Sequence, residues 1–360
     1  MKQTAAAAAA ARDLTFRRVV DIARRAPSVH NTQPWTWSIH GDALELYADR
    51  TRALEASDPD GRNLAMSCGC ALHHALVATR ALGWTPVVDT LPDPRDPDLL
   101  ARIRPRPADI PVDAVRWLDA IDARCTDRRR FTSWPIPDER LQELSSVTRS
   151  LGATAVPILD HGTRLRLEHL VDRAMMIQGQ DLRVRMEERA WIGHSTSDGM
   201  IDPAGTPWGE GHTRRRRTRF DHEAEDPATG DGAALRPIES TDGLLVVVTA
   251  DDGRLSWLRA GEALSALWLD ATIKGLSVVP LSQVVEVPDT RHRLEALLGT
   301  DMHPQILLRV GWQEIGRGDV DRTTRRPLAD VLRAVHRTGT NASAPHRPTL
   351  GGWRQRKETG

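Results

Sequence analysis

Apolar and polar residues alternate along this chain with two distinct periods. Five segments repeat their apolar residues every three or four positions, as amphipathic helices do, and they are 14–25, 62–82, 112–123, 165–189 and 257–274. Seven shorter segments have the composition and length of strands, and they are 35–39, 43–47, 85–91, 153–159, 244–250, 277–287 and 305–311. Helices and strands are thus mixed along the whole chain, which predicts a fold of both α and β elements.

Proline, glycine and polar residues divide this pattern into units. His40-Gly41-Asp42 separates two strands as a hairpin turn does, and Gly83 follows a helical pattern as a C-terminal cap does. A proline-rich connection runs from 92 to 111. We therefore expect a flexible N-terminus (1–13), a first unit (14–111), a second unit (112–338) and a disordered tail (339–360).

A fragment occurs once in each unit. The sequence G-C-A-L at 69–72 is followed by ten residues and Gly83, and G-E-A-L at 261–264 is followed by ten residues and Gly275. Each copy precedes a strand that contains a Val-Val pair, at 87–88 and at 278–279. The shared order and spacing predict two related halves within one chain.

Composition excludes several classes of function. The chain has 360 residues, with 49 basic against 49 acidic side chains, so no net field attracts nucleic acid or an anionic membrane. Its three cysteines are too few for a disulfide framework, and they lack the further ligands that a metal site needs. The longest apolar run, 244–248, has the length of a strand rather than of a membrane span. We expect a cytoplasmic protein without a metal.

The segment 26–35, A-P-S-V-H-N-T-Q-P-W, carries the most specific chemistry. Pro27 and Pro34 prevent the backbone from continuing as a helix. Between them lie five hydrogen-bonding residues: Ser28, His30, Asn31, Thr32 and Gln33. A turn that feeds a hairpin is the simpler interpretation, but such a density of donors and acceptors suits the edge of a flat heterocycle.

A second motif lies about a hundred residues further on. Arg124, Thr126 and Arg128 alternate in R-C-T-D-R, and an Arg325-Arg326 pair precedes a proline near the end of the second unit. Taken alone, either motif is typical of a solvated basic surface. Arginine also suits a phosphate dianion, because its guanidinium donates two parallel hydrogen bonds.

Together these segments identify the chain as resembling the nitroreductase family. The segment 26–35 is similar to that family's flavin-contacting P-S-x-x-N-x-Q-P-W element, and 124–128 is similar to its Arg-x-Ser-x-Arg/Lys element. The resemblance implies an α+β, nitroreductase-like fold. It also implies contacts with FMN from Pro27, Ser28, His30, Asn31, Gln33, Arg124, Thr126, Arg128, Leu281, Ser282, Gln283, Arg325 and Arg326.

The resemblance also implies roles for these residues. Arg128 is the candidate for stabilising the reduced flavin, with Arg124 nearer the phosphate or the ribityl chain, and Arg325-Arg326 match the family's phosphate-contacting end. Residues 280–283, P-L-S-Q, stand where the family has Pro-Ile-Glu-Gly and offers backbone N–H groups to flavin N5. The flavin carries the hydride chemistry, so no catalytic side chain is expected.

The distribution of the motifs is most similar to the Acg-type branch of the family, found in actinobacteria. The P-S-x-x-N element is present only in the first half and the R-x-T-x-R element only in the second. One composite site per chain is therefore implied, with two fused halves imitating the family's usual homodimer. A monomer is compatible with that arrangement.

Two functions follow from this resemblance. The leading one is an NAD(P)H-dependent oxidoreductase that passes a hydride through flavin N5, by ping-pong, to a nitroaromatic, quinone or similar small molecule. The alternative is a protein that stores FMN under a closed lid with little turnover. The segment 191–237, rich in glycine, proline and charge, is the expected lid or a loose insertion. Its Arg214–Arg217 run favours nucleic-acid binding only weakly, so we expect no nucleic-acid partner.

Overall fold

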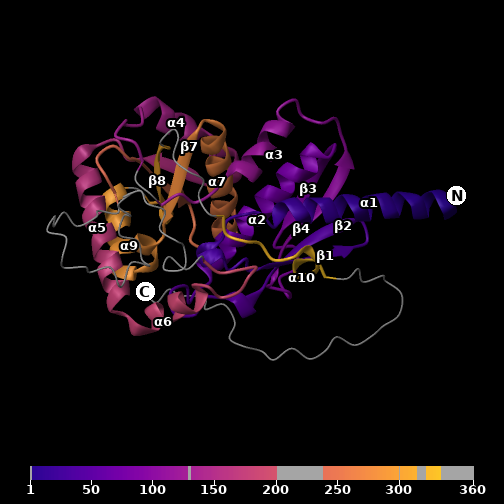
Figure 1. The fold of residues 1–360 in the computed structure, drawn as a ribbon, viewed down its shortest axis with the longest axis horizontal. Coiled ribbons are helices and arrows are strands. Elements are labelled where there is room, and N and C mark those ends of the chain that lie inside the picture. Colours follow the sequence, from indigo (N-terminus) through magenta and orange to yellow (C-terminus); the bar gives the residue numbers. More distant parts are fainter. Residues whose placement is uncertain (1, 129–130, 201–237, 300, 314–321, 334–360) are drawn as a thin grey trace, which may run out of the picture.

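The structure is a computed structural model, and it describes residues 2–128, 131–200, 238–299, 301–313 and 322–333. Two antiparallel sheets of four strands lie on opposite sides of a central pair of helices (Figure 1). The first sheet contains β1 (Trp35–His40), β2 (Ala43–Ala48), β3 (Trp84–Thr90) and β4 (Leu99–Pro107). The second contains β5 (Thr154–Pro157), β6 (Gly243–Thr249), β7 (Leu276–Leu281) and β8 (His303–Trp312).

The described helices surround these sheets. They are α1 (Lys2–Ala23), α2 (Arg62–Ala81), α3 (Ala114–Ala123), α4 (Asp138–Ser146), α5 (His161–Gln180), α6 (Leu182–Trp191), α7 (Arg254–Ile273), α8 (Gln283–Glu286), α9 (Pro288–Leu298) and α10 (Leu328–Val331). Short 3-10 turns occur at Val29–Asn31, Arg50–Arg52 and Arg149–Leu151. None of the helices in these ranges combines the length and the apolar character needed to span a bilayer.

The two sheets share one topology. The strand order is β1-β2-β4-β3 in the first and β5-β6-β8-β7 in the second, which is the same order when each sheet is counted from its first strand. The register slips once in each central pair, between Leu46 and Tyr47 in β2 and between Val247 and Val248 in β6. This is the pattern that two related halves would produce, and descent from such halves stays a prediction.

The repeated fragment marks the point where the central helices cross. α2 carries Gly69 and α7 carries Gly261, and the two glycines face each other at the centre of the molecule. A Cβ atom placed on Gly69 would lie 2.0 Å from the carbonyl oxygen of Leu258, and one placed on Gly261 would lie 2.0 Å from that of Met66. The backbones are therefore in direct contact, which only glycine permits at both positions.

The cysteines occupy the positions expected of structural thiols. Cys68 and Cys70 are buried in α2, where their Sγ atoms donate to the carbonyl oxygens of Pro34 and Gly261 at 3.2 Å each. Cys125 is half-buried, and all three are free. Within the described ranges no group of three or more His, Cys, Asp or Glu residues could hold a metal ion.

The expectation of a proline-rich connection over 92–111 is wrong, because β4 lies inside it. β2 covers this strand only as far as Ile103. Pro105 and Pro107 lie beyond that point and pair only with β3. A proline has no N–H to donate to a ladder, but it is tolerated where one side of the strand is unpaired.

Two further elements differ from the sequence-based expectation. The helix predicted over 165–189 is two helices, because Asp181 is extended (φ −81°, ψ 109°) and caps α6 through its carboxylate. The strand predicted over 277–287 ends at Leu281, after which Ser282 turns the chain into the short helix α8. At Asp181 a side-chain hydrogen bond to the backbone outweighs a continuous apolar pattern, whereas Ser282 makes no capping bond of this kind.

Buried Asp58 gives the fold a predictable pH dependence. Its Oδ2 accepts a hydrogen bond from the N–H of Leu64 at 2.9 Å, and burial raises its pKa from 3.8 to about 7. The folded chain therefore binds this proton more tightly than the unfolded chain. The stability it contributes is complete below the unfolded pKa and is lost as pH rises through the folded pKa.

The substitution Asp58→Asn keeps an acceptor oxygen and removes the buried charge. We expect the variant to gain on the order of 2 kcal/mol of unfolding free energy over wild type as pH rises from about 5 to about 8. Urea denaturation at both pH values measures the difference. A difference between variant and wild type that does not change with pH would contradict the assignment.

Candidate functional site

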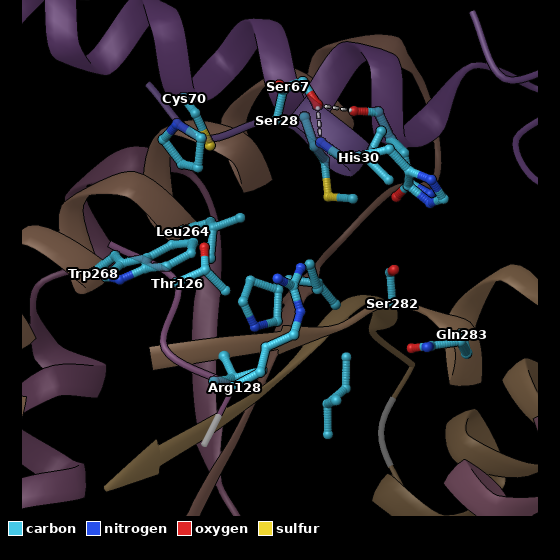
Figure 2. A pocket seen from close by; sticks show the side chains of 18 of the residues that line it. Ser28, His30, Ser67, Cys70, Thr126, Arg128, Leu264, Trp268, Ser282 and Gln283 are labelled. Atoms are coloured by element: carbon cyan, nitrogen blue, oxygen red, sulfur yellow. Dashed lines mark hydrogen bonds between the residues drawn. The ribbon is translucent and has the colours of Figure 1, made fainter. Parts of the chain in front are cut away.

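A cavity of about 1010 Å³, counted with its open mouth, lies where the two halves meet. Figure 2 shows its walls, which come from the turn after α1, from α2 and α7, from the chain after α3, and from the junction of β7 with α8. Eight of the residues expected to contact FMN line this cavity, namely Pro27, Ser28, His30, Thr126, Arg128, Leu281, Ser282 and Gln283. Segments that lie far apart along the chain thus converge on one space.

The turn after α1 has an unusual backbone. His30, Asn31 and Gln33 have φ angles of 47°, 54° and 49°, which are three of the four positive values among the described non-glycine residues. The Ser28 hydroxyl closes the turn by accepting a hydrogen bond from the N–H of Gln33 at 2.9 Å. Left-handed residues other than glycine cost roughly 1 kcal/mol or more each. Such strain is concentrated at functional sites, which favours this turn as part of one.

Asn31 and Gln33 are buried but lie outside the lining of the cavity. The Asn31 amide donates to the carbonyl oxygens of Gly199 at 2.9 Å and Thr324 at 3.1 Å. The Gln33 amide donates to the carbonyl oxygen of Ser197 at 3.0 Å. In the described structure these amides join three distant segments, and their direct contact with a ligand stays a prediction.

Arg124 and Arg325 also lie outside the lining, in a basic cluster beside it in which Arg124 is buried and Arg325 is half-buried. Both guanidinium groups donate to the carbonyl oxygen of Arg25, at 3.4 and 3.3 Å, and Arg124 stacks on Trp268, a lining residue, 4.7 Å from the ring centroid. The Nε atom of each has no hydrogen-bond partner among the described residues. In the described structure neither forms an ion pair with a carboxylate, and Arg325 donates instead to the side-chain oxygen of Asn31 at 3.1 Å. Two neighbouring cations of this kind favour the approach of an anion.

The pKa values of Arg124, Arg325 and His74 are all lowered in this cluster. Burial is the main cause that lowers the pKa of Arg124 to about 10 and of Arg325 to about 9, and the positive charge of Arg124 lowers the second further. His74 is fully buried nearby, and burial together with Arg124 lowers its pKa well below 6.5. Each shift means that burial and the neighbouring cations disfavour positive charge at this place.

Arg326 and Arg128 have different positions. Arg326 donates its backbone N–H to the Gln33 side chain at 2.8 Å and its guanidinium to the carbonyl oxygen of Gln33 at 3.1 Å, so it lies against the turn. Arg128 is solvent-exposed and extends into the cavity between Thr126 and Ser282 (Figure 2). Of the four arginines predicted at the site, only Arg128 belongs to the lining formed by the described residues.

Gln283, which stands where the family has glycine, takes an ordinary helical conformation. It is the first residue of α8 and is not among the residues with positive φ. A side chain is therefore tolerated at this position without backbone strain. Gln283 is buried, and it lines the cavity together with Ser282.

Sequence reasoning missed the helical side of the cavity. The missed residues are Asn63, Met66, Ser67 and Cys70 of α2, and Leu264 and Trp268 of α7. They recur at the three- and four-residue spacing of one helix face, beside the paired glycines. Two small polar residues, Asn63 and Ser67, within an otherwise apolar helix were the available signal.

The start of the expected lid is described, and residues 201–237 lie outside the described ranges, as do Arg214–Arg217 and the tail. Trp191 ends α6 and stacks on His194 with ring centroids 4.4 Å apart. Arg52 forms an ion pair with Asp198 and lies 5.3 Å from the centre of the Trp191 ring. Together with the hydrogen bonds from Asn31 to Gly199 and from Gln33 to Ser197, these contacts hold residues 191–200 against the first sheet's side of the molecule.

Comparisons with known proteins agree with this architecture. No protein-family model matches the chain. It is 35% identical over 322 residues to a Mycobacterium tuberculosis protein assigned provisionally as an NAD(P)H nitroreductase, covering 88% of this chain and 91% of that one. It is 33% identical to Acg of the same organism, which bears the same provisional assignment, covering 88% and 95%.

Solved structures resemble it more distantly. A nitroreductase with bound FMN from Bacteroides fragilis aligns with 61% of this chain and 98% of its own at 16% identity and a TM-score of 0.38. An iodotyrosine deiodinase bound to FMN aligns with 62% and 99% at 18% identity and a TM-score of 0.38. From the sequence relatives, which match almost end to end, the chain belongs to the nitroreductase family and is similar to its Acg branch.

Proposed function

We propose that the chain binds FMN in this cavity and uses it to reduce a nitroaromatic, quinone or similar small molecule at the expense of NAD(P)H, in ping-pong fashion. The relatives named as NAD(P)H nitroreductases support the reaction class. The cavity at the junction of the two halves supports the location.

The pair Arg124 and Arg325 is the observation that carries the proposal. FMN ends in a phosphate dianion, which needs fixed cationic donors that are not already neutralised. Arg124 is buried and Arg325 is half-buried beside the cavity, and the Nε atom of each is buried without a hydrogen-bond partner in the described chain. A phosphate at this cluster would turn an electrostatic cost of the free protein into binding energy.

The remaining lining fits a flat ring with one polar edge. Ser28 and Thr126 offer hydroxyl groups, while Met66 and Leu264 offer apolar surface that excludes water. When bound, FMN supplies the hydride chemistry, which leaves the protein to bind, orient and stabilise charge. The guanidinium of Arg128 would stabilise negative charge that develops on the pyrimidine edge during reduction.

The chain also departs from symmetry in a way that favours one site. Gly69 and Gly261 occupy matching positions of the two repeated fragments and are 192 residues apart. With the same offset, the lining residues Ser67 and Cys70 of α2 correspond to Arg259 and Glu262 of α7. Arg259 and Glu262 are larger than Ser67 and Cys70, and both are ionisable. The Arg259 side chain also packs against Gly152, where a Cβ atom added to the glycine would lie 2.7 Å from the arginine side chain. We therefore expect one FMN per chain, bound by a monomer.

A titration of the purified protein with FMN tests the proposal. Quenching of flavin fluorescence should saturate at one equivalent, and anaerobic addition of NADPH or NADH should then bleach the bound flavin. A chain that does not bind FMN overturns the proposal. If dithionite reduces the bound flavin but NADPH and NADH do not, the result favours FMN storage over turnover.

Replacement of the lining arginine tests its role in reduction. We expect Arg128→Gln to slow the bleaching of bound flavin by NADPH about tenfold to a hundredfold, because one preorganised cationic donor is removed. Stopped-flow absorbance under anaerobic conditions measures the rate. Arg104→Gln, an exposed position on β4, is the matched control and should reduce at the wild-type rate. Equal rates for Arg128→Gln and wild type would contradict the assigned role.

A further inference from the structure

The helix α8 and the residue before it present Gln283 and Ser282 to the cavity, but the helix has only four residues. A helix of this length is not stable on its own, because nucleation costs more than its few hydrogen bonds return. Its position must therefore be fixed from outside. Four hydrogen bonds from neighbouring elements do so.

Two of these bonds converge on one carboxylate. Oε1 of Glu286 accepts from the amide of Asn63 in α2 at 2.8 Å, and Oε2 accepts from the amide of Gln178 in α5 at 2.6 Å. Both amide residues are buried. The other two bonds reach the α8 backbone: Arg62 donates to the carbonyl oxygen of Val285 at 3.2 Å, and the Thr290 hydroxyl donates to that of Val284 at 2.9 Å.

The elements joined by Glu286 are three walls of the same cavity. Asn63 itself lines it, Met175 lines it one turn before Gln178, and α8 begins with the lining pair 282–283. Asn63 comes from the first half of the chain, whereas Gln178 and Glu286 come from the second. Each carboxylate oxygen is thus paired with a different wall.

We propose that Glu286 is a positioning residue of this site: its carboxylate fixes α8, and with it the backbone at Ser282 and Gln283, against the walls formed by α2 and α5. The inference rests on the proposed FMN function. Both partners donate to the carboxylate through their NH₂ groups, so each contact is a charge-assisted hydrogen bond. A carboxylate accepts both bonds, whereas an amide at 286 accepts one and meets the other partner with its own NH₂ group, so that this partner must turn its amide over.

This directionality provides a reciprocal test. Glu286→Gln replaces two charge-assisted bonds by weaker neutral ones and forces one partner amide to turn over, whereas Gln178→Glu places two carboxylates face to face. The double variant Glu286→Gln/Gln178→Glu restores one donor and one acceptor, and the amide oxygen introduced at 286 still accepts from Asn63. We expect each single variant to weaken FMN binding about tenfold and the double variant to return to within about threefold of wild type.

Three measurements separate a positioning role of Glu286 from a general effect on folding. They are the FMN dissociation constant, the visible spectrum of bound flavin, and the thermal unfolding of the FMN-free chain. Gln180→Glu, an exposed position on the same helix, is the matched control and should not change them. Gln178→Ala is a milder variant that leaves Glu286 its bond from Asn63, should a single variant not fold. Single variants that bind FMN with wild-type affinity and spectrum overturn the positioning role, as does a folded double variant that recovers nothing. Failure of wild type to bind FMN instead rejects the proposed function.

Discussion

Replacing Arg124 by methionine is expected to weaken FMN binding about 100-fold or more while leaving the FMN-free chain at least as stable as wild type. Two effects with opposite signs produce this result. In the absence of an anion, the buried guanidinium has an unpaired Nε and a pKa lowered to about 10 by burial, so its removal relieves a cost. In the presence of the phosphate, the same group provides a charge-assisted hydrogen bond in a buried site.

Titration by fluorescence quenching gives the dissociation constant, and urea denaturation without FMN gives the stability. Methionine keeps much of the length of the side chain and its contact with Trp268. Arg116→Met, an exposed position on α3, is the matched control and should change neither quantity. A variant that loses FMN and stability in parallel would show that Arg124 holds the fold rather than the phosphate.

Arg325→Met should also weaken FMN binding, because both guanidinium groups share the carbonyl oxygen of Arg25. Unlike Arg124→Met, it should lower the stability of the FMN-free chain, because the Arg325 guanidinium also donates to the side-chain oxygen of Asn31 at 3.1 Å and to the Thr323 hydroxyl at 2.9 Å. The two effects on binding are not expected to add, since either substitution also lowers the repulsion felt by the remaining arginine.

Substitution of alanine at Gly69 or Gly261 is expected to destabilise the chain by about 3 kcal/mol or more. The added methyl group would lie 2.0 Å from a backbone carbonyl oxygen of the opposite helix in each case. Backbone cannot rotate away as a side chain can, so α2 and α7 must separate. Because both helices also line the cavity, FMN binding should weaken together with stability.

Gly179→Ala is the matched control for these two substitutions. Gly179 also lies within a helix, α5, but nothing lies within 4 Å of the Cβ position. Alanine there should stabilise the chain by roughly 0.5 kcal/mol, because it restricts the unfolded backbone more than glycine does. Urea denaturation of the three variants measures the contrast. If Gly69→Ala and Gly179→Ala behave alike, the helices do not cross at these glycines.

Local signals in the sequence were sufficient for most elements of the fold. The hairpin of β1 and β2, the end of α2 before Gly83, and the apolar strand β6 are where turn residues and periodicity predict them. β4 was missed because Pro105 and Pro107 argue against a strand, and only the extent of β2 shows that they lie where no partner needs their N–H. The break at Asp181 was missed for a comparable reason, since one side-chain cap outweighs a long apolar pattern.

The sequence by itself determined which family the motifs resemble and that they stand in two separate stretches of the chain, whose relation as two halves stays a prediction. It also contained the glycine repeat, although spacing alone does not reveal that Gly69 and Gly261 touch. Tertiary structure decided which side of each motif faces the cavity. Ser28 and His30 line it, whereas Asn31, in the same turn, is directed by its left-handed backbone toward 199 and 324. The physical reason is that hydrogen-bond partners and burial are properties of segments brought together by folding, and no local pattern specifies them.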